Sequence, residues 1–163
     1  MVIMGVDPGL KGIGFGLIEG SKTRARLIRF GRVELPSAPT FPPLLQTVYH
    51  KIRRIIQTYR PEVYAIETLF YNKDAKGAIL LGHVRGVLLL AAADSGLSIV
   101  EYSPLEIKKS VVGRGMASKE QVQFMVKSLL QMNELPEPLD ASDALACALC
   151  YLNKPVEDGK FVI

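Results

Sequence analysis

The first seven residues constrain the fold more than any other stretch of the chain. Residues 2–6 form a short, almost wholly apolar run, typical of a β-strand that is buried on both faces. The Pro8-Gly9 turn ends this run and leaves Asp7 where the strand emerges from the core. A carboxylate in that position is costly unless another group pairs with it or uses it. We therefore ask which groups elsewhere in the sequence are expected to converge on Asp7.

Length and charge indicate one soluble-type domain with a substantial core. The chain has 163 residues, of which 48% are hydrophobic and 22% charged. We expect a single domain over residues 1–155 and a short, loose tail over residues 156–163. Twenty basic against 16 acidic residues give a net charge of +4, which permits a nucleic-acid partner without requiring one.

No segment predicts export or membrane insertion. Asp7 and Lys11 interrupt any apolar leader, so we expect a cytoplasmic protein with no membrane contact. The most apolar segment, residues 78–93, contains His83 and Arg85, and it is short for a membrane span. It is interpreted as a helix that is either buried or faces a partner.

The only two cysteines, Cys147 and Cys150, form an isolated C-x-x-C motif in a helical pattern. A zinc site needs two further ligands, and neither His50 nor His83 lies near these cysteines in the sequence. The pattern favours small core residues on one face of a helix.

The order of the elements predicts an α/β fold. Glycines alternate with apolar residues over 11–18, which favours a tight hairpin from the first strand into a second, with room for another backbone to approach. No helix and no G-K-[ST] motif follow, so a nucleotide-binding loop is not supported. Later strands are expected over 25–35, 63–67 and 97–102, and helices over 44–59, 75–95, 103–113, 118–132 and 139–152. This order suits a mixed five-stranded sheet flanked by helices, whose first three strands form an antiparallel meander.

Four carboxylates stand out by their positions. Asp7 and Glu67 each end an apolar strand, while Asp140 and Asp143 lie one turn apart at the start of the last helix. Clustered carboxylates repel one another unless cations compensate, and hard oxygen ligands favour Mg²⁺ or Mn²⁺. Two such ions about 3.5–4 Å apart are suited to phosphodiester hydrolysis.

Each acid also has a simpler interpretation. Asp140 could cap its helix, with Asp143 stabilised by the helix dipole. Glu67 could be a salt-bridge partner, and Asp7 could serve only to form a turn. The cluster is favoured because all four simple explanations would have to hold at the ends of the most buried elements.

Basic and aromatic residues add a candidate DNA surface. Lys108, Arg114 and Lys119 fall in one short stretch with two glycines and two helix starts, suited either to phosphate contact or to a solvated face. Phe70 and Tyr71 follow Glu67 in an expected loop, where they could join the core or stack on unpaired bases.

Taken together, these motifs resemble the RuvC-type Holliday-junction resolvases. The resemblance extends from the first residues to about Leu152, and the order and spacing of the motifs make it specific. It is carried by Gly5-Val-Asp-Pro-Gly9, Ala65-Ile-Glu67 followed by Phe70, Leu81-Gly-x-x-Arg-Gly86, Lys108-x-x-Val-Val-Gly113, Lys119-x-Gln-Val-Gln123 and Asp140-Ala-x-Asp-Ala-Leu-Ala146.

The resemblance implies an RNase H-like fold and a homodimeric endonuclease that resolves four-way DNA junctions in recombination and repair. The family's acidic quartet, which holds two Mg²⁺ ions per subunit, falls on Asp7, Glu67, Asp140 and Asp143. Its catalytic lysines fall on Lys108 and Lys119, its base-stacking aromatic falls on Phe70, and a branch-migration motor is the implied partner. Arg114 is a candidate DNA contact from the basic stretch alone.

Within that interpretation, the helix around 77–93 is the expected dimer contact, because Gly82 and Gly86 share one of its faces. Two rival functions remain at this point. An actin-like ATPase could share the Asp7-Pro-Gly turn but usually needs two such domains. A junction-binding module without cleavage would gain nothing from clustered negative charge.

Overall fold

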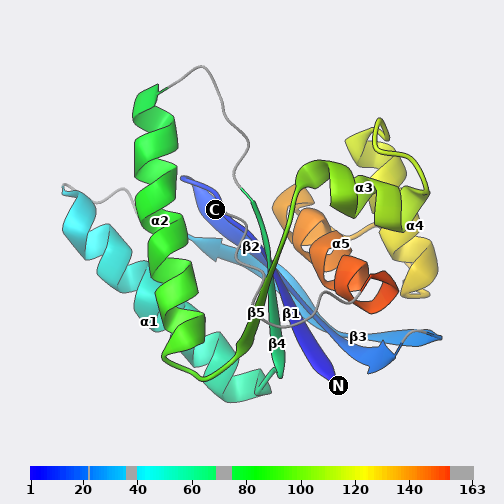
Figure 1. Cartoon of the computed structure of the whole chain (residues 1–163), viewed down its shortest axis with the longest axis horizontal. Coiled ribbons are helices and arrows are strands. Elements are labelled where there is room, and N and C mark those ends of the chain that lie inside the picture. The colour runs from blue at the N-terminus through cyan, green and yellow to red at the C-terminus, as the bar shows by residue number, and fades with distance from the viewer. Residues whose placement is uncertain (22, 36–39, 69–74, 155–163) are drawn as a thin grey trace.

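The structure, a computed structural model, is built on one mixed sheet and describes residues 1–21, 23–35, 40–68 and 75–154 (Figure 1). The strand order is β3-β2-β1-β4-β5, in which β1, β2 and β3 are antiparallel and β1, β4 and β5 are parallel. The strands are β1 (Val2–Asp7), β2 (Gly12–Ser21), β3 (Arg24–Glu34), β4 (Val63–Glu67) and β5 (Ser98–Tyr102). The predicted five-stranded sheet with its N-terminal meander is confirmed.

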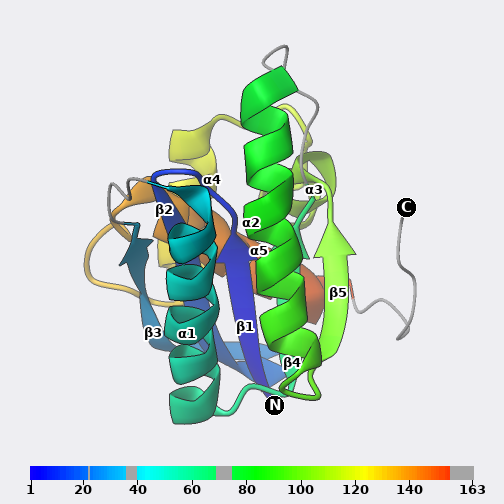
Figure 2. The ribbon, with the colours of Figure 1, turned by 90° about the vertical axis from the view of Figure 1, so that its left-hand side faces the viewer.

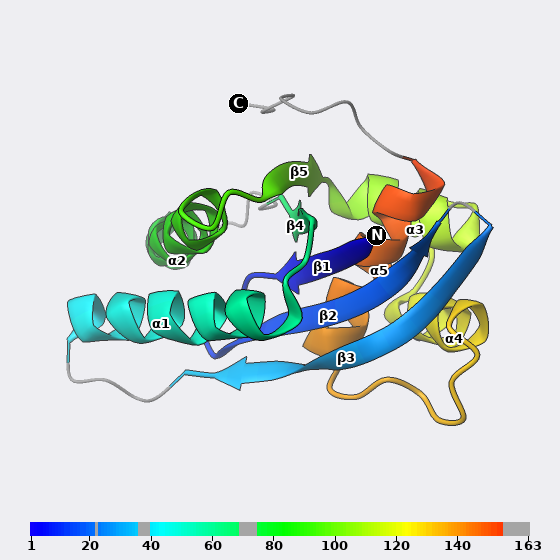
Figure 3. The same cartoon turned by 90° about the horizontal axis from the view of Figure 1, so that it is seen from below.

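Helices cover both faces of the sheet (Figures 1 and 3). One face carries α1 (Phe41–Tyr59) and α2 (Ala75–Ala93), and the other carries α3 (Pro104–Val112), α4 (Lys119–Leu129) and α5 (Leu139–Asn153). α1 begins three residues earlier than the apolar period predicts, because Pro42 fits the first turn of a helix, where its missing N–H is not needed.

The helix starts follow local sequence chemistry. Ser103 with Glu106 and Ser118 with Gln121 form capping boxes at the two helix starts in the basic stretch, and Gly113 ends α3 in a left-handed conformation with φ of 87°. α5 differs from the expectation. Its N-cap is Pro138, with no side-chain cap, so Asp140 lies inside the first turn and does not cap the helix.

α5 is the central helix of the fold. Ten of its fifteen residues are buried, and it contacts all five strands. Cys147 and Cys150 are buried free thiols on this helix, as predicted, and burial raises the pKa of each. Apolar contact on this scale fixes α5 rigidly against the centre of the sheet.

Glycines in β1 and β2 allow α5 to lie directly on the strand backbone. A Cβ at Gly5 would come within 1.9 Å of the Ala144 carbonyl oxygen, and one at Gly14 within 1.9 Å of the Asp140 carbonyl oxygen. The sequence expectation that the glycines within 11–18 admit another backbone is confirmed at Gly14, where that backbone is the start of α5.

α2 is largely apolar, without a distinct polar face, and is only partly covered. Four of its residues are buried, whereas Ile79 and Leu90 are 62% and 53% exposed. With 19 residues it is long and apolar enough, by length and composition, to cross a membrane. The most apolar segment of the sequence, residues 78–93, is by itself short for a span. In the structure it packs along the sheet, and Arg85 pairs with Glu101 of β5, as in a helix at the edge of a globular core.

Candidate active site

Strand register brings Asp7 and Glu67 together. Val6 of β1 pairs in parallel with Ile66 of β4, so the next residues, Asp7 and Glu67, end adjacent strands. Side chains alternate along a strand, and both carboxylates fall on the face that α5 covers, opposite to the face of Val6 and Ile66. The opening strand and its repeat in residues 63–67 thus place two acids side by side.

The start of α5 adds Asp143 and Asp140. Asp7 pairs across the sheet with Gly14, and Gly14 lies directly beneath the Asp140 backbone. One helical turn separates Asp140 from Asp143, so both stand above the same strand ends. The contact that glycine permits is therefore what brings the helix acids to the strand acids.

Three of the four acids line one cavity. It measures about 180 Å³ and lies between the strand ends and α3, α4 and α5. Two lysines and three apolar residues line the same cavity as these acids. Its lining residues are Asp7, Glu67, Pro104, Ile107, Lys108, Lys119, Val122 and Asp143.

Burial and mutual repulsion alter the titration of this site. Burial, followed by repulsion from Glu67, Asp143 and Asp140, raises the pKa of Asp7 to about 8. Burial and Asp143 likewise raise the pKa of Glu67 to about 7. The two strand acids are thus held in a setting where added positive charge is strongly stabilising.

Lys119 supplies one such charge. Its Nζ lies 3.0 Å from Asp143 Oδ2 and donates a hydrogen bond to it, which raises the pKa of the lysine. Lys119 is the first residue of α4, where free backbone N–H groups also face outward. Lys108 lines the same cavity from α3. The two lysines singled out from the sequence therefore meet the acids in one place.

Asp140 is turned toward a partner that the sequence did not reveal. Arg32 Nε on β3 lies 3.2 Å from Asp140 Oδ2, and the same guanidinium packs over Gly12. Asp140 does not line the 180 Å³ cavity. Only the β2–β3 register, which places Arg32 opposite Gly14, could have suggested this contact.

The donor set suits a hard divalent cation. All four candidate ligands are carboxylates, and burial together with repulsion from neighbouring acids raises the pKa of Asp7 and of Glu67, a cost that a bound cation would relieve. Among the described residues, no three of these carboxylates lie close enough to coordinate one ion together. Asp140 pairs with Arg32, and Asp143 pairs with Lys119.

The other residues singled out from the sequence either do not line the cavity or lie outside the described part of the chain. Arg114 is exposed in the α3–α4 connection and does not line the cavity. Phe70 and Tyr71 lie outside the described residues. The alternative in which Glu67 serves as a salt-bridge partner finds no support among the described residues, where Glu67 makes no ion pair.

A five-stranded sheet of this order, with acids at the ends of its two central strands and on the helix across them, defines the class of RNase H-like nucleases. Residues 3–151 match the family of the crossover junction endodeoxyribonuclease RuvC, and the chain belongs to that family. The family is one of metal-dependent nucleases that act on DNA.

Relatives match over nearly the whole chain. The crossover junction endodeoxyribonuclease RuvC of Heliobacterium modesticaldum is 47% identical, and the match covers 92% of this chain and 93% of the relative. That of Alkaliphilus oremlandii is 45% identical over 93% and 92%.

Among solved structures, Thermus thermophilus RuvC is similar with a TM-score of 0.84, 31% identity and 93% coverage of both chains. The same protein in complex with a Holliday junction substrate gives 0.83 and 28% identity, covering 93% of this chain and 92% of that one. The yeast mitochondrial resolvase Ydc2 shares the fold at 0.70 and 12% identity, over 93% and 77%.

Proposed function

We propose that this protein resolves four-way DNA junctions by cutting phosphodiester bonds at the cavity formed by β1, β4 and α5. The observation that carries the proposal is the meeting of acids from two strand ends and one helix with two lysines in a single cleft. Membership of the nuclease family and the similarity to a relative solved with a Holliday junction support the substrate.

The residues divide into two chemical roles. Asp7, Glu67, Asp140 and Asp143 are the proposed metal ligands, with Asp7 and Glu67 fixed by the sheet and the other two by α5. Bound Mg²⁺, proposed as two ions per subunit, with Mn²⁺ able to substitute, would supply a nucleophilic water and stabilise the leaving oxygen.

Lys108 and Lys119 act on the substrate side. Both reach the cavity from α3 and α4, so their ammonium groups stabilise the charge of the scissile phosphate. With cations held by the acids, Lys119 would no longer be needed as the partner of Asp143 and would be free for this role. Arg114 contacts the DNA backbone beyond the cavity, and Phe70 stacks on a base near the scissile bond.

The exposed side of α2 supports a homodimer as part of the proposal. Ile79, Gly82, Gly86 and Leu90 lie along one exposed face of the helix. A Cβ at Gly82 or Gly86 would meet nothing within 4 Å, so these glycines serve no packing inside the described chain and would admit a second α2 closely. Two sites related by a two-fold axis fit paired nicks in a symmetric junction.

The cellular setting is proposed from the resemblance. We place the protein in the cytoplasm, as one folded domain over residues 1–155 with a short tail, working with a branch-migration motor. None of these assignments affects the chemistry of the cavity.

A junction-cleavage assay tests the function. Wild type and Asp7→Asn are incubated with a synthetic four-way junction and with matched duplex DNA, each with and without Mg²⁺. Wild type with Mg²⁺ is expected to give paired nicks in the junction alone, while Asp7→Asn binds it without cutting. Asp94→Asn, which removes an acid that pairs with Tyr49 far from the cavity, is the matched control.

Three outcomes oppose the proposal. Binding by both proteins without any nicks supports a binding module, and ATP turnover without junction binding supports an ATPase. Equal cutting by wild type and Asp7→Asn would place the chemistry elsewhere.

A further inference from the structure

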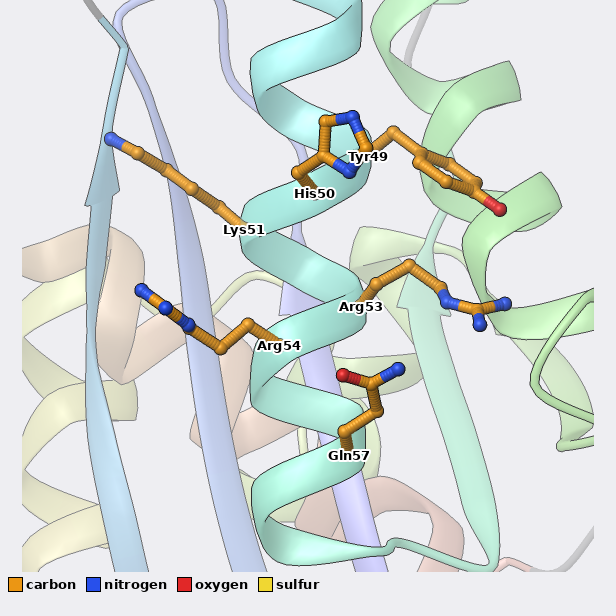
Figure 4. Close-up of a pocket in the computed structure, with 6 residues that line it drawn as sticks. All are labelled: Tyr49, His50, Lys51, Arg53, Arg54 and Gln57. Atoms are coloured by element: carbon orange, nitrogen blue, oxygen red, sulfur yellow. The ribbon is translucent and has the colours of Figure 1, made fainter.

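A second charged surface lies on α1, outside the catalytic cavity. A groove of about 600 Å³ runs along the exposed side of this helix, and all its lining residues come from α1 (Figure 4). None of them is acidic, and four carry a cation or an imidazole. The lining residues are Tyr49, His50, Lys51, Arg53, Arg54 and Gln57.

Part of this surface is committed to holding α1 against the end of α2. Tyr49 donates a hydrogen bond of 2.6 Å to Asp94, and Arg53 lies 4.0 Å from the same carboxylate and over the Tyr49 ring. Figure 4 shows Tyr49 and Arg53 extending from the side of α1 toward α2. These two residues are structural and are not counted as a free cationic surface.

Lys51 and Arg54 extend from the opposite side of α1, away from α2 (Figure 4). Both are exposed, and neither forms an ion pair with any described side chain. The Lys51 ammonium donates to the Glu34 backbone carbonyl at 2.8 Å, which places it beside the end of β3 and leaves its charge uncompensated. A pairing of α2 helices in a dimer would leave this side of α1 open.

The adjoining edge strand extends the same charge. Arg29 of β3 is exposed and lies opposite Leu17, whose side chain packs on the face that α1 covers. Paired residues of antiparallel strands point to the same face, so Arg29 stands on the α1 side of the sheet. Lys51, Arg54 and Arg29 therefore present positive charge from two elements on one side of the molecule.

This surface continues from the catalytic end. α1 begins at the end of the molecule where β1 and β4 finish and runs from there toward the other end (Figure 2). Lys51 and Arg54 lie in its middle turns, one turn apart, about 4.5 Å along the helix axis. A duplex that leaves the catalytic end on this side would pass along them.

We propose that this α1 surface, formed by Lys51 and Arg54 with Arg29 beside them, binds the phosphate backbone of one duplex arm of the junction. The chemistry favours DNA over an acidic protein. A protein interface requires an apolar or aromatic core, whereas the single aromatic side chain here is already tied to Asp94. Phosphates require only exposed cations, which confer affinity without reading sequence.

The inference rests on junction binding by this protein, and the salt dependence of that binding tests it. Lys51→Gln/Arg54→Gln is introduced into the Asp7→Asn protein, and its dissociation constant for a four-way junction is measured from 50 to 200 mM salt. Each phosphate contact contributes about 0.9 to the slope, so the slope should fall by about 1.8 for each protomer in contact. With one protomer in contact, the affinity of the Asp7→Asn parent would then drop over that range roughly 12-fold more than that of the variant.

A variant of equal charge change is the matched control. Arg24→Gln/Lys127→Gln removes two cations that lie beside other grooves, near α4, and should leave the slope unchanged. With Asp7 intact, the control Arg24→Gln/Lys127→Gln should cut the junction at the wild-type rate, because neither residue lines the cavity.

Equal slopes for the α1 variant and its parent would overturn the inference and leave an acidic protein as the better occupant. An equal fall in both double variants would also overturn it, by showing a general charge effect. Failure of wild type to nick junctions would instead contradict the proposed function, and the binding slopes would still report on α1.

Discussion

At the scale of single residues, the sequence predicts those site residues that are marked by their immediate neighbours in the chain. Asp7 and Glu67 could be chosen because each ends a continuous apolar run, and both prove to be half-buried neighbours at strand ends. The partner of Asp140 could not be predicted, because Arg32 lies more than a hundred residues away and is one of several arginines on β3. Only the folded register selects it from the others.

The raised pKa of Asp7 predicts an unusual stability profile for the metal-free protein. Since the folded state holds a proton on Asp7 up to about pH 8 and the unfolded state loses it near pH 3.8, the free energy of unfolding should fall between these values as the pH rises. Asp7→Asn removes this loss, so at pH 8 in chelator the variant should be more stable than wild type, on the order of 3–5 kcal/mol.

Urea unfolding at pH 4 and pH 8 in chelator measures this effect. The two proteins should have similar stability at pH 4, where Asp7 is protonated in the folded state and, with a pKa of 3.8, still about 40% protonated when unfolded. Asp94→Asn, at an exposed acid, should show no such gain at pH 8. A difference between wild type and Asp7→Asn that does not change with pH would contradict the burial argument.

At the scale of elements, the sequence predicted each helix and strand within a few residues, since periodicity and capping residues are local signals. The alternating glycines also predicted close approach of a backbone, although not that it belongs to α5. The expectation that Asp140 could cap its helix was wrong, because Pro138 takes the N-cap position and leaves Asp140 free to contact Arg32. The ends of helices depend on the chain that precedes them.

Gly14→Ala tests the contact between β2 and α5. The new Cβ would lie 1.9 Å from the Asp140 carbonyl oxygen, a backbone atom that can move only if α5 shifts. We expect a loss of stability of about 1–3 kcal/mol. Junction cleavage should fall by roughly 100-fold, because a shift near 1 Å in Asp140 and Asp143 is enough for such a loss.

Gly31→Ala provides the control for this change. Its Cβ would meet only the Phe15 ring, at 3.2 Å, and should leave cleavage close to the wild-type rate. Single-turnover cleavage together with thermal unfolding separates the two effects. Full activity in Gly14→Ala would show that α5 need not lie so close to the strand for catalysis.

At the scale of the whole molecule, the fold separates two surfaces by function. The α5 face of the sheet carries the acids, while α2 on the other face keeps an apolar side uncovered. The sequence predicted a helix that is buried or faces a partner; in the structure four of its residues are buried, while Ile79 and Leu90 are exposed. Family membership is decided at this scale too, since the match spans residues 3–151.

Leu90→Lys tests the proposed dimer face. Leu90 is 53% exposed, so the change should leave the folded monomer intact while placing like charges across a two-fold interface. Sedimentation at micromolar concentration should give a dimer for wild type and a monomer for the variant, and paired nicking should be lost. Leu135→Lys, at a residue 44% exposed near α4, should remain dimeric. A monomeric wild type would contradict the α2 assignment.

The most direct test of the four-carboxylate site is single-turnover cleavage of a four-way junction in Mg²⁺ by four variants, Asp7→Asn, Glu67→Gln, Asp140→Asn and Asp143→Asn. If the four carboxylates form one catalytic site, each variant should lose at least about 100-fold in rate while still binding the junction, because each removes charge from that site. Asp94→Asn should cut at the wild-type rate. Near wild-type cleavage by any of the four would show that its carboxylate does not belong to the site and would contradict the central claim.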